Sequence, residues 1–140
     1  MTSTSFVDLD SQLCLYIRGL NSDSADCGLG FVPASGQLSL QMDPGSKTIQ
    51  SYFNGTADLA INFELSLNNQ SYQEAREILN PIAQALEALQ EGDIQSANGS
   101  FLFDHIEITS RPFNQIVDAS GNIFWTTTFT AYVTTTKGSN

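Results

Sequence analysis

The sequence ADLAINFELSL, residues 57–67, shows the most regular alternation of apolar and polar residues in the chain. Every second residue from Ala57 to Leu67 is apolar, and Asp58, Asn62 and Glu64 lie between them. A period of two predicts a β-strand whose apolar side chains share one face. Such a strand belongs to a sheet with one buried face and one polar face.

Two shorter strands are predicted before this one. Residues 37–43 alternate and end at an Asp-Pro-Gly turn. Residues 47–53 form the second strand, and the Asn54-Gly55 pair that follows is the strongest short signal for a β-hairpin. The apolar face of the first of these strands consists of Leu38, Leu40 and Met42.

Two further strands are predicted in the last third of the chain. Residues 100–109 form one of them, and there His105 shares a face with Phe101, Phe103 and Glu107. After a loop through Pro112 to Asp118, residues 121–135 form a long last strand. One face of the last strand carries Ile123, Trp125, Thr127, Phe129, Ala131 and Val133, and the other carries Asn122, Phe124, Thr126, Thr128, Thr130, Tyr132 and Thr134.

Two amphipathic helices complete the pattern. Residues 5–20 form the first, and Asp8 and Asp10 lie in its first turn, where the helix dipole favours negative charge. A loop of residues 21–36 follows. The apolar stripe of this helix consists of Phe6, Leu9, Leu13, Ile17 and Leu20 at spacings of three and four.

The second helix is predicted over residues 72–90, with Ser71 and Glu74 as a capping box. Pro81 in its middle predicts either a kink or a new start with Asn80 as N-cap. Its stripe consists of Tyr72, Ala75, Leu79, Ile82, Leu86 and Leu89. The whole order predicts an α+β fold, in which a mostly antiparallel sheet of four or five strands packs against two α-helices.

Composition excludes several classes of protein. The 140 residues predict one domain, residues 1–140. Fifteen acidic residues against five basic ones give a net charge of −10, and the basic residues are scattered singly. Binding to the phosphates of nucleic acid or to an anionic membrane needs clustered basic residues, so we expect neither. The N-terminus lacks the basic start of a secretory signal, and no stretch approaches the roughly 18 apolar residues of a membrane helix.

Residues suited to catalysis or metal binding are few. His105 could act as a general base oriented by Asp104 or Glu107, but no nucleophile is placed beside it, which favours an ordinary strand histidine. Cys14 and Cys27 are expected to be free thiols, with a disulfide between them as the alternative. Their spacing without a histidine is not a zinc pattern, and the acidic pairs are too sparse for a calcium loop. We therefore expect no enzyme, no cofactor and no metal.

Two features favour a protein that assembles. The last strand is unusually long, and Phe124 and Tyr132 lie on its threonine-rich outer face, which suits another packed surface. The alternative is a solvated face. Apolar residues also lie at turns, where they commonly mark partner contacts, unless they are anchors tucked under the domain. These apolar residues are Tyr52 and Phe53, which lie next to the Asn54-Gly55 turn, and Phe113 and Ile116 in the loop after Pro112.

The residues from 40 to 136 resemble those of a known family. KTIQSYFNGTADLAINFELSLNNQSYQEAREILNPIAQALEAL, residues 47–89, precedes NGSFLFDHIEITSRPFNQIVDASGNIFWTTTFTAYVTTT, residues 98–136. This order is similar to that of the tail terminator proteins of bacteriophages with long non-contractile tails, some of them called minor capsid proteins. The matching positions are Ala75, Leu79, Leu86 and Glu87 with Leu89 in the helix, Pro112, Asp118 and Gly121 around the turn, and Phe124 and Phe129 in the long strand.

The resemblance implies a virion protein at the head–tail interface. Six subunits would form a ring that caps the tail tube, stops its growth and meets the head–tail connector. Phe124 and Tyr132 are then candidates for one side of the ring interface, with a helical patch on the other side. The turn residues around Phe53 and Ile116 are candidates for contact with the tube or the connector. Six chains of −10 give a ring of −60, whose channel lets DNA pass without binding it.

Two alternatives to a tail terminator stay open. Another neck or head-completion protein of the virion would share the small size and the ring assembly, and it would differ in its partner. A monomeric α+β domain that binds a ligand or acts as an enzyme would place Trp125 and His105 in one pocket.

Overall fold

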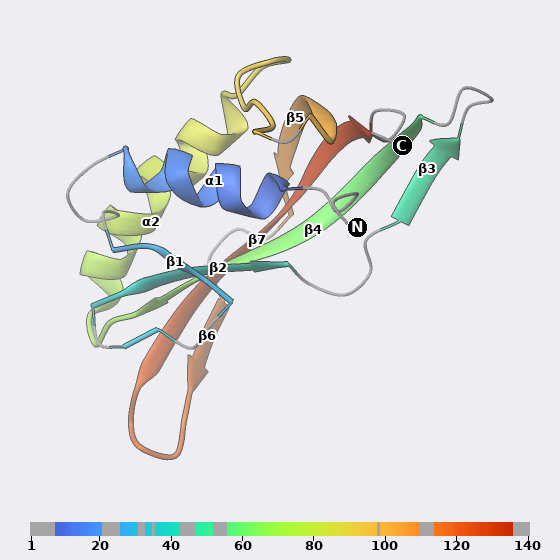
Figure 1. Cartoon of the computed structure of the whole chain (residues 1–140). Coiled ribbons are helices and arrows are strands. Elements are labelled where there is room, and N and C mark those ends of the chain that lie inside the picture. Colours follow the sequence, from blue (N-terminus) through green and yellow to red (C-terminus); the bar gives the residue numbers. More distant parts are fainter. Residues whose placement is uncertain are drawn as a thin grey trace.

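The computed structural model describes residues 8–20, 26–30, 33–34, 36–42, 47–51, 56–97, 99–109 and 114–135. Its elements follow in the order α1 (Leu9–Arg18), β1 (Gly28–Leu29), β2 (Leu38–Met42), β3 (Lys47–Ser51), β4 (Ala57–Asn68), α2 (Tyr72–Glu87), β5 (Phe101–Ile108), β6 (Asn114–Val117) and β7 (Ile123–Thr135). The strands form one mostly antiparallel sheet, and both helices lie on the same side of it (Figure 1). The predicted α+β fold is confirmed. None of the described helices is long and apolar enough to cross a membrane.

Two long antiparallel strands, β4 and β7, form the centre of the sheet. They pair over their whole length, from Ala57 with Thr135 to Asn68 with Phe124. The outer edge of each long strand carries two short strands, one at each end. β2 and β6 flank one end, which we call the β6 end, and β3 and β5 flank the other, which we call the β5 end. β1 adds to β2 in parallel.

The core lies between the sheet and the helices, on what we call the covered face. The rings of Phe63 and Phe129 stack there with their centroids 5.4 Å apart, and both side chains are fully buried. The helices contribute Leu9, Leu13 and Ile17 from α1 and Leu79, Ile82 and Leu86 from α2. The opposite face, which no described helix covers, is the open face (Figure 1). The alternation predicted for β4 and β7 is therefore confirmed.

The start of α2 differs in detail from a capping box. The predicted half is present, since the Glu74 amide donates to the Ser71 hydroxyl at 3.2 Å. The reciprocal bond is replaced, because the Ser71 amide donates to Asn69 Oδ1 at 2.8 Å instead. Pro81 lies inside an uninterrupted helix, so a new start at Asn80 was wrong. The buried stripe continues across the proline, and its packing outweighs the roughly 3 kcal/mol cost of an interior proline.

Several predicted boundaries are corrected. β1 and β6 were expected to be loops, and with them the described sheet has seven strands instead of four or five. α1 ends at Arg18, before Leu20, and Asp8 is its N-cap residue. Met42 is 44% exposed, because it ends β2 outside the core cluster. Phe6 and the Asn54-Gly55 turn lie outside the described residues, although β3 pairs with β4 as that turn predicts.

Candidate functional site

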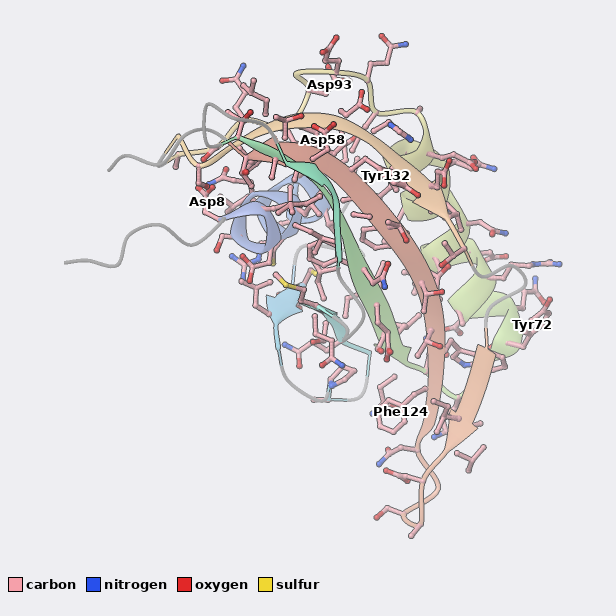
Figure 2. All side chains as sticks on the ribbon, turned by 90° about the vertical axis from the view of Figure 1, so that its right-hand side faces the viewer. Asp8, Asp58, Tyr72, Asp93, Phe124 and Tyr132 are labelled. Atoms are coloured by element: carbon pink, nitrogen blue, oxygen red, sulfur yellow. The ribbon has the colours of Figure 1, made fainter. Side chains whose placement is uncertain are left out.

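The two predicted ring-interface residues lie on the open face at opposite ends of β7 (Figure 2). Phe124 belongs to the β6 end and Tyr132 to the β5 end. Eight residues separate them, which corresponds to about 26 Å along a strand. The structure therefore shows two separate surfaces instead of one patch.

The other candidates are placed only in part. Ile116 was expected on a loop, but it lies in β6 and pairs directly with Phe124. The two side chains share the open face, so a predicted ring contact and a predicted tube contact form one surface. The remaining candidates, Tyr52, Phe53, Asn54 and Phe113, lie outside the described residues.

A groove of about 200 Å³ lies at the β6 end of the open face. Its apolar lining comes from Phe124, Ile116 and Pro33, and Ile116 is 54% exposed. Its polar lining comes from Gln41, Glu64, Ser66 and Thr126. The Ser66 hydroxyl donates to Glu64 Oε2 at 3.1 Å, which orients this carboxylate beside the groove. We call this feature the β6-end groove.

The middle of the open face is a network of hydrogen bonds between neighbouring strands. Thr126 and Thr130 are buried, although they lie on the polar side of β7. The bonds join Thr130 Oγ1 to Asn62 Oδ1 at 2.8 Å, Thr134 Oγ1 to Asp58 Oδ1 at 2.7 Å, and the hydroxyls of Thr109 and Thr128 at 2.8 Å. Because these hydroxyls bond within the sheet, the threonine face is internally satisfied.

Tyr132 is held by its neighbours at the β5 end. Its ring stacks on His105 with centroids 4.6 Å apart, and its hydroxyl donates to Glu107 Oε1 at 3.1 Å. That hydrogen bond, together with burial and the charge of Glu107, raises the pKa of the Tyr132 hydroxyl. His105 Nδ1 lies 3.1 Å from Asp104 Oδ2, and its Nε2 lies 3.9 Å from Glu107 Oε2. Both acids named from the sequence therefore contact the histidine.

The face predicted for His105 was wrong. The pairing of β5 with β7 shifts by one residue between Phe103 and His105, so Asp104 forms a bulge. After the bulge Ile106 is buried, while His105 pairs with Tyr132 on the open face. A bulge inserts one unpaired residue and so reverses the alternation beyond it.

A second surface, which the sequence pattern placed in the core, lies at the start of α2. Tyr72 is 53% exposed, and its ring packs on Trp125 with centroids 5.4 Å apart. The guanidinium of Arg76 lies 5.6 Å from the centre of the Tyr72 ring, within reach of a cation–π interaction. We call these two side chains the Tyr72–Arg76 patch. The signal in the sequence was an aromatic residue followed by arginine four positions later, near the start of a helix.

The groove and the patch lie on opposite sides of the same end of the sheet. Phe124 and Trp125 are adjacent in β7, so their side chains point to opposite faces. Phe124 lines the groove, and Trp125 supports Tyr72. Figure 2 shows Phe124 and Tyr72 on either side of the β6–β7 hairpin.

Asp8 makes a connection that the sequence did not predict. Its carboxylate accepts hydrogen bonds from the Ser96 hydroxyl at 2.7 Å, the Ala97 amide at 2.8 Å and the Ser100 hydroxyl at 3.2 Å. Burial alone would raise the pKa of this carboxyl, but the hydrogen bonds outweigh burial and lower the pKa. Asp8 thus ties the start of α1 to the segment before β5.

The two cysteines are free thiols, and both are buried. Cys14 Sγ donates to the carbonyl oxygen of Cys27 at 3.4 Å, and Arg18 Nε donates to the same oxygen at 2.6 Å. Burial, together with the neighbouring Cys14, raises the pKa of the Cys27 thiol to about 12. Within the part of the chain that the structure describes, no group of three or more His, Cys, Asp or Glu side chains could hold a metal ion.

No protein-family model matches the chain, and a search of curated proteins finds no match.

Proposed function

We propose that this protein is a ring-forming structural subunit of a bacteriophage tail, a tail terminator. Six copies form a ring that caps the finished tail tube, stops its elongation and joins the tail to the head connector. One observation carries the assembly step of this proposal. None of the helices that the structure describes lies over the open face, which ends in a groove walled by Phe124 and Ile116. Exposed apolar side chains grouped on an otherwise polar face are suited to a contact with another protein.

The opposite side of the hairpin supports the same proposal. The Tyr72–Arg76 patch combines tyrosine and arginine, two residue types enriched at the centres of protein interfaces. A ring is built from head-to-tail contacts, which need two different patches on every subunit. The groove and the patch supply two such surfaces, and one of them is helical.

The net charge suits a ring through which DNA passes. Each chain carries −10, so six carry −60. A channel lined with negative charge repels the phosphates of DNA and so lets the duplex move without binding. In this proposal the protein resides in the virion at the head–tail interface, and its partners are the tail tube protein and the connector proteins.

The alternative, a ligand-binding domain, would need Trp125 and His105 to line one pocket. Trp125 belongs to the core on the covered face, and its Nε1 donates to the Asn69 carbonyl oxygen at 2.8 Å. His105 lies on the open face against Tyr132. The two residues therefore do not share a cavity. A neck or head-completion protein would use the same ring contacts, so the partner distinguishes it from a terminator.

The proposed function is tested by molar mass and by microscopy. Light scattering gives the mass of the protein with and without purified tail tubes, and electron microscopy then shows the tube ends. A six-fold density confined to one tube end supports a tail terminator. Binding to isolated connectors but not to tubes would identify a neck protein instead. A protein that stays at the 15.2 kDa of one chain under every condition contradicts both assignments.

Two substitutions test the open face of the ring. Phe124→Asp adds a charge to a groove that already contains Glu64, and we expect it to dissociate the ring. Tyr132→Asp is the matching test at the β5 end. Leu15→Asp is the control, because Leu15 is 57% exposed on α1, away from both surfaces. Light scattering measures all three, and an intact Phe124→Asp ring would remove the groove from the interface.

A further inference from the structure

We infer that the Tyr72–Arg76 patch of one subunit docks into the β6-end groove of the next, with Arg76 beside Glu64. This inference rests on the proposed ring, and it names the contact that joins the subunits. The occupant of the groove is thus a second copy of this chain, and charge, shape and position each support that choice.

The lining of the β6-end groove is suited to bind a surface that carries an aromatic ring and a positive charge. Phe124, Ile116 and Pro33 form an apolar wall in a space of about 200 Å³. Glu64 contributes a carboxylate on the same lining, and the Ser66 hydroxyl holds it at 3.1 Å. A carboxylate beside apolar walls binds a cation more strongly than one in open water, because the walls exclude solvent.

The Tyr72–Arg76 patch presents an aromatic ring together with a positive charge. Tyr72 is half exposed, and Arg76 lies over its ring, so the two side chains project together from the first turns of α2. Among the side chains that the structure describes, Arg18 and Arg76 are the arginines. Arg18 Nε already donates to the Cys27 carbonyl oxygen at 2.6 Å. Of these two described arginines, Arg76 is the one placed to meet a carboxylate on another molecule.

Charge makes the pairing selective. Two copies that each carry −10 repel, so a stable contact between them needs a cation where they meet. The groove holds Glu64, and the start of α2 holds Arg76, with Glu74 and Glu77 close to it in sequence. Docking the patch into the groove places Arg76 against Glu64, whereas two grooves facing each other would place Glu64 against Glu64.

The positions of the two surfaces give a head-to-tail contact. They lie on opposite sides of the β6 end, so each copy offers the groove on one side and the patch on the other (Figure 2). A contact between unlike surfaces repeats from copy to copy, and it closes into a ring when the rotation between neighbouring copies is a whole fraction of a turn. A standard interface buries about 800 Å² on each partner. That is about a tenth of the 7522 Å² surface of this chain, so the contact must also include side chains that surround the groove and the patch.

Charge reversal tests the contact under the condition in which the wild-type protein assembles. Glu64→Arg and Arg76→Glu each place like charges together, and we expect each to weaken assembly by roughly 30-fold or more. The double variant restores an opposite pair and should recover most of the loss. Glu87→Arg is the control, because it makes the same charge change on an exposed residue at the far end of α2. Light scattering and circular dichroism report assembly and folding.

A mixing experiment tests the head-to-tail arrangement. Phe124→Asp removes the groove but keeps the patch, and Arg76→Glu removes the patch but keeps the groove. Each variant alone should remain a monomer of 15.2 kDa, while an equal mixture should form dimers and nothing larger. If Phe124→Asp fails to fold, Ile116→Asp replaces it, because Ile116 is half exposed.

The outcomes separate this inference from the proposed function. If the wild type forms a ring and both charge-reversal variants still form it, the inference is wrong and the ring stands. If Phe124→Asp keeps the ring but no longer caps tubes, the groove binds the tail tube, and the inference is again wrong. If the wild type never assembles, even on tail tubes, the proposed function and the inference fail together.

Discussion

The covered and open faces of the sheet use the same two strands in different ways. On the covered face, Phe63 and Phe129 stack in a space that both helices close. On the open face, Thr130 bonds to Asn62 and Thr134 bonds to Asp58 across the same pair of strands. Buried apolar area supplies most of the free energy of folding, while hydrogen bonds at a surface add little. The open face is therefore the side on which substitutions can change assembly without changing the fold.

The largest expected effect is on the covered face. Phe129→Ala removes a ring that is 1% exposed and leaves a cavity beside Phe63, so the free energy of unfolding should fall by about 3–5 kcal/mol. Phe124→Ala is the matched control on the open face of the same strand, with an expected loss of less than about 1.5 kcal/mol. Urea unfolding followed by circular dichroism measures both. Equal losses would contradict the division between the two faces.

A smaller effect on stability is expected at Asp8, whose carboxylate connects the start of α1 to the segment before β5. Asp8→Asn leaves the donors of Ser96 and Ala97 without their carboxylate, and the free energy of unfolding should fall by about 1–3 kcal/mol at pH 7. The folded-state pKa of Asp8 lies below its ordinary value of 3.8. The stabilisation is therefore fully present above pH 3.8 and is lost as the pH falls through the lower, folded-state pKa.

The pH dependence gives this prediction its control. The difference between the wild type and Asp8→Asn should shrink as the pH is lowered below 3.8. Asp10→Asn should cost less, because Asp10 Oδ1 accepts a hydrogen bond from the neighbouring Ser11 amide on α1 itself. Urea unfolding at a series of pH values measures both variants. If the difference in the free energy of unfolding between the wild type and Asp8→Asn stays constant down to pH 2, the charge of Asp8 does not stabilise the fold.

The smallest effect is expected at the β5 end of the open face. Tyr132→Phe removes the hydrogen bond to Glu107 but keeps the stacking on His105, so the free energy of unfolding should change by less than about 0.5 kcal/mol. The same urea titration measures it. A loss of 2 kcal/mol or more would show that this surface hydrogen bond supports the fold as the core does.

Periodic features of the fold were predictable from the sequence. The alternation in β4 and β7 identified their buried faces because every residue of a regular strand keeps the same period. The apolar stripe of α2 was likewise predictable, and its packing carries the helix through Pro81. β6 was missed because its four residues are too few to show a period, and their pairing with β7 comes from tertiary structure.

The candidate site was less predictable, since it depends on contacts between distant segments. The bulge at Asp104 places His105 on the opposite face from the one predicted. No glycine at this position indicates a bulge in the sequence. Asp8 bonds to residues that lie 88 to 92 positions further along the chain. Phe124 and Tyr132 were correctly placed on one face, but only the structure joins Phe124 to Ile116 in a groove.

The buried thiols make the protein convenient to label. A thiol with a pKa of about 12 is deprotonated in roughly one molecule in 10⁵ at pH 7, so Cys27 should react very slowly with maleimides. Cys14 is shielded by its burial in the core. A cysteine introduced at Leu102, which is 65% exposed, would then be the main reactive position in the described part of the chain. One dye per subunit would follow, and counting photobleaching steps on a single particle would give the number of subunits directly.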